Sequence, residues 1–304
     1  MLCWPTPGSA RPNVAPSTSP TLAGCPVLPA DNPFNQRVDR LAVAPDSAQI
    51  IARIGLDAPV HPDFGTVYAG APNGIPYTVV GAGVRPVHIS FTYAGESDRG
   101  PYPIPPTAPV EGGASSAGDR HVIVVDRANC TDYELDDARR VRGGSAWTAG
   151  SGAIFKLRSD HLRPAGWTSA DAAGLPILPG LARYAEDQTG AINHALRFTA
   201  PCTAARYVYP ARHDTSGCAL SHAPPMGLRV RLKASVNISR LPLQARIVAT
   251  ALKRYGLILA DNGSPWYISG APNPRWKDDA LHALDRLSGR DFEVVNTRAL
   301  PHPG

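Results

Sequence analysis

The sequence predicts a mainly β protein, in which one antiparallel β-sandwich or jelly-roll-like domain carries two helices near the C-terminus. Proline and glycine supply 32 and 28 of the 304 residues, well above their usual share of about 12%, which predicts many turns. Short runs rich in β-branched and aromatic residues fill the middle of the chain, and helical periodicity comes mainly late. An α+β fold with a split sheet is the second choice.

One short helix is expected early in the folded part. Residues 45–55 offer Asp46 or Ser47 as an N-cap, place three isoleucines on one face and end at Gly55. Strands are then expected at 75–83, 86–93, 120–126, 152–158, 194–199, 206–210 and 228–234. The run "HVIVVD" is apolar almost throughout and is typical of a central strand. Residues 228–234 alternate apolar and basic side chains, which predicts a strand with one solvated face.

Two helices are expected late in the chain, at 241–256 and 277–289. In both, apolar residues recur at three- and four-residue steps and a glycine ends the pattern. Between them an apolar run ends at Asp261, Asn262 and Gly263, which is typical of a β-hairpin with positive φ at Asn262-Gly263. A strand at 291–295 completes the chain.

Residues 1–24 are rich in Pro, Ser and Thr and are expected to form a disordered leader, followed by a single domain over 25–304. The first 20 residues lack the apolar segment of an ordinary signal peptide. The tetrapeptide at Leu22–Cys25 spells a lipobox, but the polar residues before it favour a chance match. No run of about 18 apolar residues occurs, so no membrane span is expected.

Five cysteines suggest a disulfide framework. Cys202 and Cys218 bracket a loop of hairpin size, Cys25 and Cys130 are the remaining pair to test, and Cys3 lies in the leader. Buried free thiols in a cytosolic protein are the alternative. Disulfides would imply an oxidising compartment, and hence a secreted or extracellular protein.

Charge and motifs exclude several function classes. The net charge is +5, yet only four lysines occur and the arginines are scattered, so nucleic-acid binding is not expected. The motifs GxSxG, GxxxxGK[ST] and HExxH are absent. His61 with Asp63, or His213 with Asp214, would suit a metal, but neither pair has a recognised spacing. No metal ligands and no cofactor are therefore assigned.

Candidate catalytic carboxylates follow the expected strand at 86–93. Glu96 and Asp98 are two residues apart, so an extended chain would point them to the same side. Paired carboxylates repel, which raises one pKa and can separate acid and base roles. An acidic surface turn is the alternative. Asp261 offers an opposing carboxylate, although a turn residue is the simpler interpretation of it.

His194 and Arg197 complete the candidate catalytic set. They lie on opposite faces of the strand expected at 194–199. His194 is either a core imidazole or the polar member of a lined cavity, and Arg197 either clamps a carboxylate or pairs on the surface.

Aromatic residues could supply stacking faces for sugar rings, with core packing as the alternative. The long irregular segment 167–184 is typical of a loop that shapes a site on a rigid sheet. The candidate binding residues are Tyr102, Trp167, Trp266, Tyr267 and Trp276.

Several stretches resemble a family of mostly secreted bacterial β-rich proteins with no settled activity. They include "CPVLPADNPFNQRVD", "ESDRGPYPIP", "GWTSADAAGLPILPGLARY", "PPMGLRVRLKAS" and "RYGLILADNGSPWYISGAP". The resemblance extends over about residues 25–297, and these stretches are spread along it. The resemblance implies an extracellular compartment and a β-rich fold, and it carries over no catalytic residues.

Two functional hypotheses follow. The first is an extracellular glycoside hydrolase, in which Glu96 or Asp98 opposes Asp261, since glycoside hydrolysis usually needs two carboxyl groups. His194 and Arg197 then orient the substrate. The second is a non-catalytic glycan-binding or cell-surface protein on the same scaffold. In both hypotheses the partner is a polysaccharide or another glycan, and no feature indicates an oligomeric state.

Overall fold

The computed structural model describes residues 19–141, 145–215 and 217–304. Within these ranges the strands form five sheets and the helices are few, which confirms the mainly β fold predicted from the sequence. Of the expected leader, residues 1–18 lie outside the described residues. Strand pairing begins with β1 (Thr21–Leu22) against β2 (Cys25–Pro26), a few residues before the expected domain start.

The largest sheet has six strands in the order β17-β14-β15-β13-β16-β3. The pairs β13/β15 and β16/β3 are parallel and the others antiparallel, so the sheet is mixed rather than wholly antiparallel. Its strands are β3 (His61–Asp63), β13 (Leu196–Ala200), β14 (Arg229–Leu232), β15 (Leu257–Asn262), β16 (Tyr267–Ser269) and β17 (Phe292–Val294).

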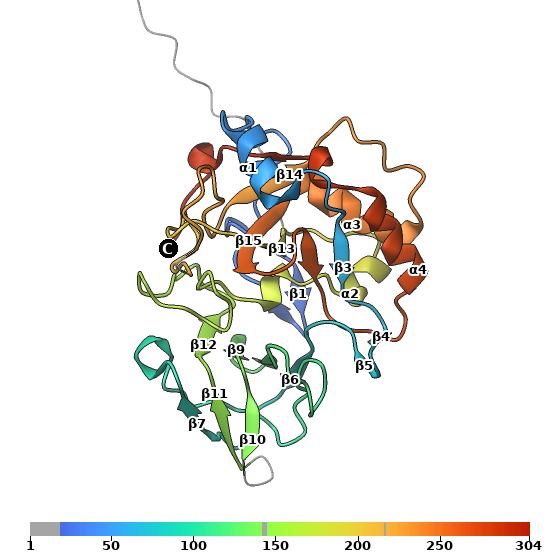
Figure 1. Cartoon of the computed structure of the whole chain (residues 1–304). Coiled ribbons are helices and arrows are strands. Elements are labelled where there is room, and N and C mark those ends of the chain that lie inside the picture. Colours follow the sequence, from blue (N-terminus) through green and yellow to red (C-terminus); the bar gives the residue numbers. More distant parts are fainter. Residues whose placement is uncertain (1–18, 142–144, 216) are drawn as a thin grey trace, which may run out of the picture.

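Helices pack against this sheet in the upper part of Figure 1. α1 (Ser47–Gly55) contacts β17 and α3 (Leu243–Arg254) contacts β14, each where apolar periodicity predicts a helix. The third predicted helix divides into α4 (Asp278–Leu281) and the 3₁₀ segment η4 (His282–Arg286). The remaining short elements are β4 (Val67–Tyr68), β5 (Ala71–Pro72), η1 (Ala94–Glu96), η3 (Leu178–Gly180), α2 (Tyr184–Gln188), η5 (Gly289–Asp291) and η6 (Thr297–Ala299).

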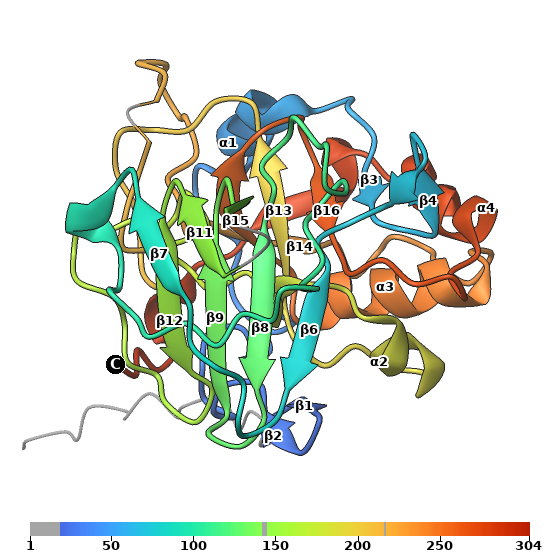
Figure 2. The ribbon, with the colours of Figure 1, turned by 90° about the horizontal axis from the view of Figure 1, so that it is seen from below.

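Two smaller sheets form the other half of the molecule, seen from below in Figure 2. The four-stranded sheet has the order β12-β9-β8-β6 and the three-stranded sheet the order β10-β11-β7. Their strands are β6 (Tyr77–Val80), β7 (His88–Phe91), β8 (Val122–Asp126), β9 (Thr131–Leu135), β10 (Arg139–Val141), β11 (Ala146–Ala149) and β12 (Gly152–Lys156).

Strand β8 is buried on both faces, which explains its unbroken apolar run. Ile123 and Val125 join the core shared with the six-stranded sheet, whereas Val122 and Val124 join a second core against the three-stranded sheet. Successive side chains of a strand point to opposite faces. The four-stranded sheet is therefore the middle of three β layers.

Residues 257–269 do not form the predicted hairpin. β13 lies between β15 and β16, so the connection crosses the end of β13 instead of turning back beside β15. Positive φ occurs at Trp266 (61°) and not at Asn262 or Gly263. The apolar run before Asp261 belongs to an interior strand rather than to one arm of a hairpin.

The basic side of β14 is likewise less solvated than predicted, because β14 is an interior strand. Arg229 is 4% exposed and donates to the carbonyl oxygens of Tyr255, Pro33 and Gln36. Burial lowers the pKa of Arg229 to about 9. The stretch 206–210, predicted to be a strand, makes only an isolated bridge at Tyr207.

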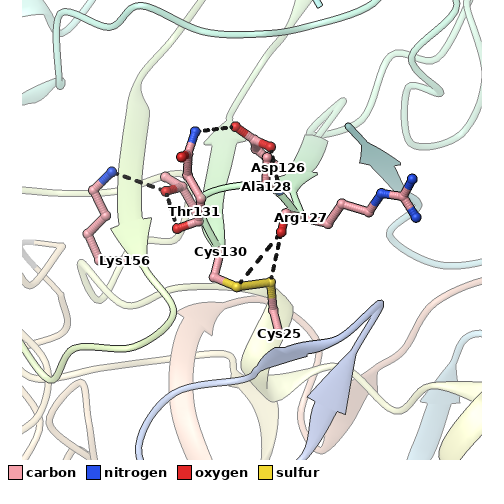
Figure 3. Close-up of a disulfide and its surroundings, with 8 residues drawn as sticks. Cys25, Asp126, Arg127, Ala128, Cys130, Thr131 and Lys156 are labelled. Atoms are coloured by element: carbon pink, nitrogen blue, oxygen red, sulfur yellow. Dashed lines mark hydrogen bonds between the residues drawn. A yellow bond between two sulfur atoms is a disulfide. The ribbon is translucent and has the colours of Figure 1, made fainter. Parts of the chain in front are cut away.

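Two disulfides confirm the cysteine pairing predicted from the sequence. Cys25–Cys130 spans 105 residues and joins β2 to the turn between β8 and β9, with both sulfur atoms near the carbonyl oxygen of Arg127 (Figure 3). Cys202–Cys218 closes a loop with a separation of 16, and Cys3 lies outside the described residues. Such bonds are typical of proteins from oxidising compartments.

A buried carboxyl pair fastens the segment that follows Trp167. Asp132 and Glu134 lie two residues apart on β9, and Glu134 accepts the backbone N–H groups of Ile177 and Leu178 at 2.8 Å. Burial raises the pKa of both carboxyl groups, and the charge of Glu134 raises that of Asp132 further, so the pair retains a proton. The loop over residues 167–180 is thereby anchored to the middle sheet.

The two disulfides should differ in their contribution to stability. In the chain-entropy model, closing a loop of about 100 residues stabilises by about 4.7 kcal/mol and one of about 15 residues by about 3 kcal/mol. We therefore expect Cys25→Ser/Cys130→Ser to lower the free energy of unfolding more than Cys202→Ser/Cys218→Ser. Denaturant titration of both double variants measures this difference, and a larger loss for the shorter loop would contradict it.

Candidate functional site

A cavity of about 440 Å³ opens where the ends of the sheets meet. A second cavity of about 150 Å³ shares Asp119, His121, Asp261 and Asn262 with it. We call the two together the cleft. Its walls come from the segment after β7, the residues just before β8, the loop at 168–172 and the end of β15, so residues distant in sequence meet there.

Asp261 reaches the cleft because of a β-bulge. Phe198 on β13 pairs with Leu259 on β15, but Thr199 pairs with Asp261, so Ala260 is an extra residue. Without it, Asp261 would lie on the face of Phe198, which points into the core. The bulge instead turns Asp261 to the face shared by Arg197 and Thr199. Bulges commonly re-aim a side chain beside a site.

Arg197 links side chains from several elements at the base of the cleft. Its guanidinium, 4% exposed, donates to Asp171 Oδ2 (3.3 Å) and Ser269 Oγ (2.6 Å) and lies 3.7 Å from Asp261 Oδ2. Burial lowers the pKa of Arg197, but the carboxylates of Asp171 and Asp261 more than offset this and raise it overall. A buried charge of this kind requires paired carboxylates around it.

The pKa of Asp261 lies far above its ordinary value. Burial and the neighbouring Asp171 raise the pKa of Asp261 to about 7, although Arg197 acts in the opposite direction. About a quarter of the side chain stays exposed. A carboxyl group with this pKa in an open cleft can give up a proton at physiological pH.

Glu96 lies on another wall of the larger cavity. One of its carboxylate oxygens accepts the N–H of Thr168 (3.2 Å) and lies 3.9 Å from Nε2 of His213. His213 donates from Nδ1 to the carbonyl of Ala172 (2.8 Å), which turns Nε2 toward Glu96. Glu96 is 40% exposed and so remains accessible to water or a ligand.

A charged histidine completes the wall between the two cavities. His121 has Nδ1 at 2.6 Å from Glu111 and Nε2 at 3.0 Å from the carbonyl of Ala170, so both ring nitrogens face acceptors. Burial lowers the pKa of His121, but Glu111 raises it to about 10 overall. Asp136 lies on the same cavity, and burial raises its pKa to about 6.

The structure brings three of the five candidate catalytic residues to the cleft: Glu96, Asp261 and Arg197. Asp98 points elsewhere, because the 3₁₀ turn η1 ends the extended chain on which the same-side prediction rested. Its carboxylate accepts Arg163 Nη1 (2.5 Å) and the N–H of Ile154 (2.9 Å). Asp98 therefore forms a structural ion pair with Arg163 and does not line the cleft.

His194 also lies away from the cleft. Only 1% exposed, it contacts Glu186 Oε2 (3.1 Å) and the carbonyl of Ala195 (2.8 Å), beside Arg183. The core-imidazole alternative therefore describes His194.

Three of the five candidate aromatic residues are buried and present no face to a ligand. Trp266 stacks between Phe198 and Phe292; Tyr102 and Trp276 are 0% and 3% exposed. Trp167 and Tyr267 are partly exposed, and Tyr267 lines the smaller cavity.

Several residues that line the cleft were not predicted from the sequence. Tyr93, 57% exposed, lines the larger cavity with Asp119, Asp136 and Asp171. Asp119 and His121 directly precede the most apolar strand, and that abrupt change was an available signal. Asp171 lies in the loop already expected to shape a site. Asp136 carries no comparable signal, since an acidic residue after a strand is common.

The residues best placed to bind a metal ion lie outside the cleft. Within residues 19–141, 145–215 and 217–304, the one group of His, Cys, Asp or Glu side chains close enough to share an ion is His61, His282 and Asp285. The cleft carboxylates form no such group among these residues.

The chain matches no protein-family model, no curated protein and no solved structure. Across the described residues, every helix is too short or too polar to cross a lipid bilayer.

The raised pKa of Asp261 predicts a pH-dependent stability. Between 3.8, its ordinary pKa, and about 7, the folded protein holds a proton that the unfolded chain releases. The stabilisation of the folded state by this proton is complete below pH 3.8 and is lost as the pH rises through 7. Asp261→Asn removes it, so the melting temperature of the variant should rise relative to the wild type between pH 4 and pH 8. The exposed Asp279→Asn is the matched control, and parallel pH curves for all three proteins would refute this assignment.

Proposed function

We propose that the protein is an extracellular glycan-processing enzyme that hydrolyses glycosidic bonds with Asp261 as general acid and Glu96 as base. The observation that carries this proposal is a carboxyl group with a pKa of about 7 in the same cleft as the exposed carboxylate Glu96. Two carboxyl groups with different protonation states are what glycoside hydrolysis requires.

The surroundings of each carboxyl group support its role. Burial beside Asp171 raises the pKa of Asp261 to about 7 and so favours its protonated form before the reaction, and Arg197, 3.7 Å away, stabilises the carboxylate left after proton transfer. Glu96 accepts a backbone N–H from Thr168 and lies 3.9 Å from His213, and its side chain is exposed enough to reach a water molecule. Tyr93 offers an exposed ring at the cleft wall, as glycan-binding sites commonly do.

The proposed reaction is a single displacement by water. Asp261 donates its proton to the glycosidic oxygen as the bond from that oxygen to the anomeric carbon breaks. Glu96 takes a proton from the water whose oxygen bonds to that carbon. Two shorter glycans leave, and exchange with solvent returns a proton to Asp261 and removes one from Glu96.

The two disulfides are compatible with an extracellular location. The alternative of a non-catalytic glycan-binding protein uses the same cleft and Tyr93, but it needs no proton donor. The two functions therefore differ in their response to removal of the Asp261 proton.

Substitution of either carboxyl group should slow hydrolysis strongly. General acid and base groups contribute about 10²–10⁴-fold each, so Asp261→Asn and Glu96→Gln should lower kcat by at least about 100-fold. Release of reducing ends from a polysaccharide panel measures this. Asp279→Asn should keep full activity, and melting curves verify folding of each variant. If the wild type binds a glycan without cleaving any member of the panel, the binding protein is the correct function.

The charge of the cleft predicts which glycans bind. The larger cavity is lined by Glu96, Asp119, Asp136, Asp171 and Asp261, so even with Asp261 protonated four carboxyl groups face two histidines. Like charges across an interface disfavour binding. Neutral or amino-sugar polymers should therefore bind at least about tenfold more tightly than polyuronates, with salt weakening the amino-sugar complexes. Calorimetry with Asp261→Asn measures this order, and tighter polyuronate binding would contradict it.

A further inference from the structure

We propose that His61, His282 and Asp285 form a binding site for a divalent transition metal of the zinc class. Each residue offers one ligand atom, and the three atoms lie within 4.8 Å of one another. The ligands come from a sheet edge and from a segment more than 200 residues later, so no sequence spacing reveals the set. The proposal is independent of the function proposed for the cleft.

His61 is held in place before any ion binds. It lies on β3, where its backbone N–H donates to the carbonyl of Trp266 (3.0 Å) and it pairs in register with Tyr267. The His61 and Tyr267 rings pack with centroids 4.2 Å apart. A ligand whose ring is already oriented loses little conformational freedom on binding.

The two other ligands share one side of η4. A 3₁₀ helix has three residues per turn, so His282 and Asp285 project together. His282 Nδ1 lies 3.3 Å from Asp285 Oδ2, and the two side chains are 48% and 41% exposed. Leu281 and Leu284, on the buried side, fix the segment against the core. The centroid of the His282 ring lies 5.6 Å from that of His61.

The donor set selects the class of ion. Two imidazoles with one carboxylate suit Zn²⁺ and its neighbours, whereas Ca²⁺ and Mg²⁺ take oxygen ligands. Tetrahedral zinc with ligands at about 2.0–2.2 Å separates ligand atoms by about 3.4 Å. The exposed side chains of His282 and Asp285 can close the remaining distance by small rotations. Three protein ligands leave one position for water.

A bound ion would join β3 to the C-terminal helical segment. β3 is an edge strand and makes contact with η4. Tyr267, which packs on His61, also lines the smaller cavity of the cleft. The metal would therefore stabilise the wall of the cleft that Tyr267 helps to form.

The test is zinc titration of the full chain, freed of any affinity tag, by isothermal calorimetry and thermal melting. We expect one ion per chain and a melting temperature that rises with zinc concentration. His282→Ala and Asp285→Asn should each weaken zinc binding by at least about tenfold. Both residues are exposed, so the metal-free variants should melt like the wild type. His161→Ala removes another exposed histidine and should bind zinc normally.

Three results would overturn the proposal: no zinc binding tighter than about 1 mM, binding that survives His282→Ala, or equal loss in His161→Ala. Magnesium serves as the ion control. A magnesium response equal to that of zinc would indicate a carboxylate site elsewhere and likewise reject this ligand set.

Discussion

The buried guanidinium of Arg197 is the interaction on which the cleft depends. A charge inside a protein is tolerated only when it is paired, and here Asp171 and Ser269 accept hydrogen bonds from the guanidinium while Asp261 lies 3.7 Å away. These partners come from the 167–180 loop, β16 and β15, while Arg197 itself belongs to β13. One side chain therefore fixes the relative position of three strands and a loop, and sets the electrostatic environment of Asp261.

The geometry of the cleft follows from this arrangement and from two local departures from regular structure. The bulge at Ala260 brings Asp261 to the Arg197 face, and the 3₁₀ turn η1 separates Glu96 from Asp98. Glu96 then reaches the cleft from η1, which follows β7, and Asp261 reaches it from β15. The middle sheet supports both sides, because Glu134 anchors the loop that carries Asp171.

Local patterns predicted much of the fold, since the spacing of apolar residues and the composition of a segment indicate which of its side chains are buried. The helices at α1 and α3, the central strand β8 and both disulfides lie where the sequence places them. The order of strands in a sheet depends on contacts between residues far apart in sequence. The insertion of β13 between β15 and β16 could therefore not be predicted. For the site, Asp261 was predicted from its position after an apolar run. The role of Asp98 depends on Arg163, which is distant in sequence. That of His194 depends on Glu186, which lies on α2, a short helix that the sequence did not predict.

The bond between Cys25 and Cys130 has a further consequence for the integrity of the molecule. The β4/β5 hairpin lies between these cysteines in sequence, and its Val67 and Tyr68 are 62% and 75% exposed. Hydrolysis of a peptide bond at this exposed tip by a protease would release no fragment, since the sulfur link still joins the pieces on either side. The clipped chain stays one covalent species as long as its surroundings remain oxidising, and it separates into two polypeptides only under denaturing and reducing conditions.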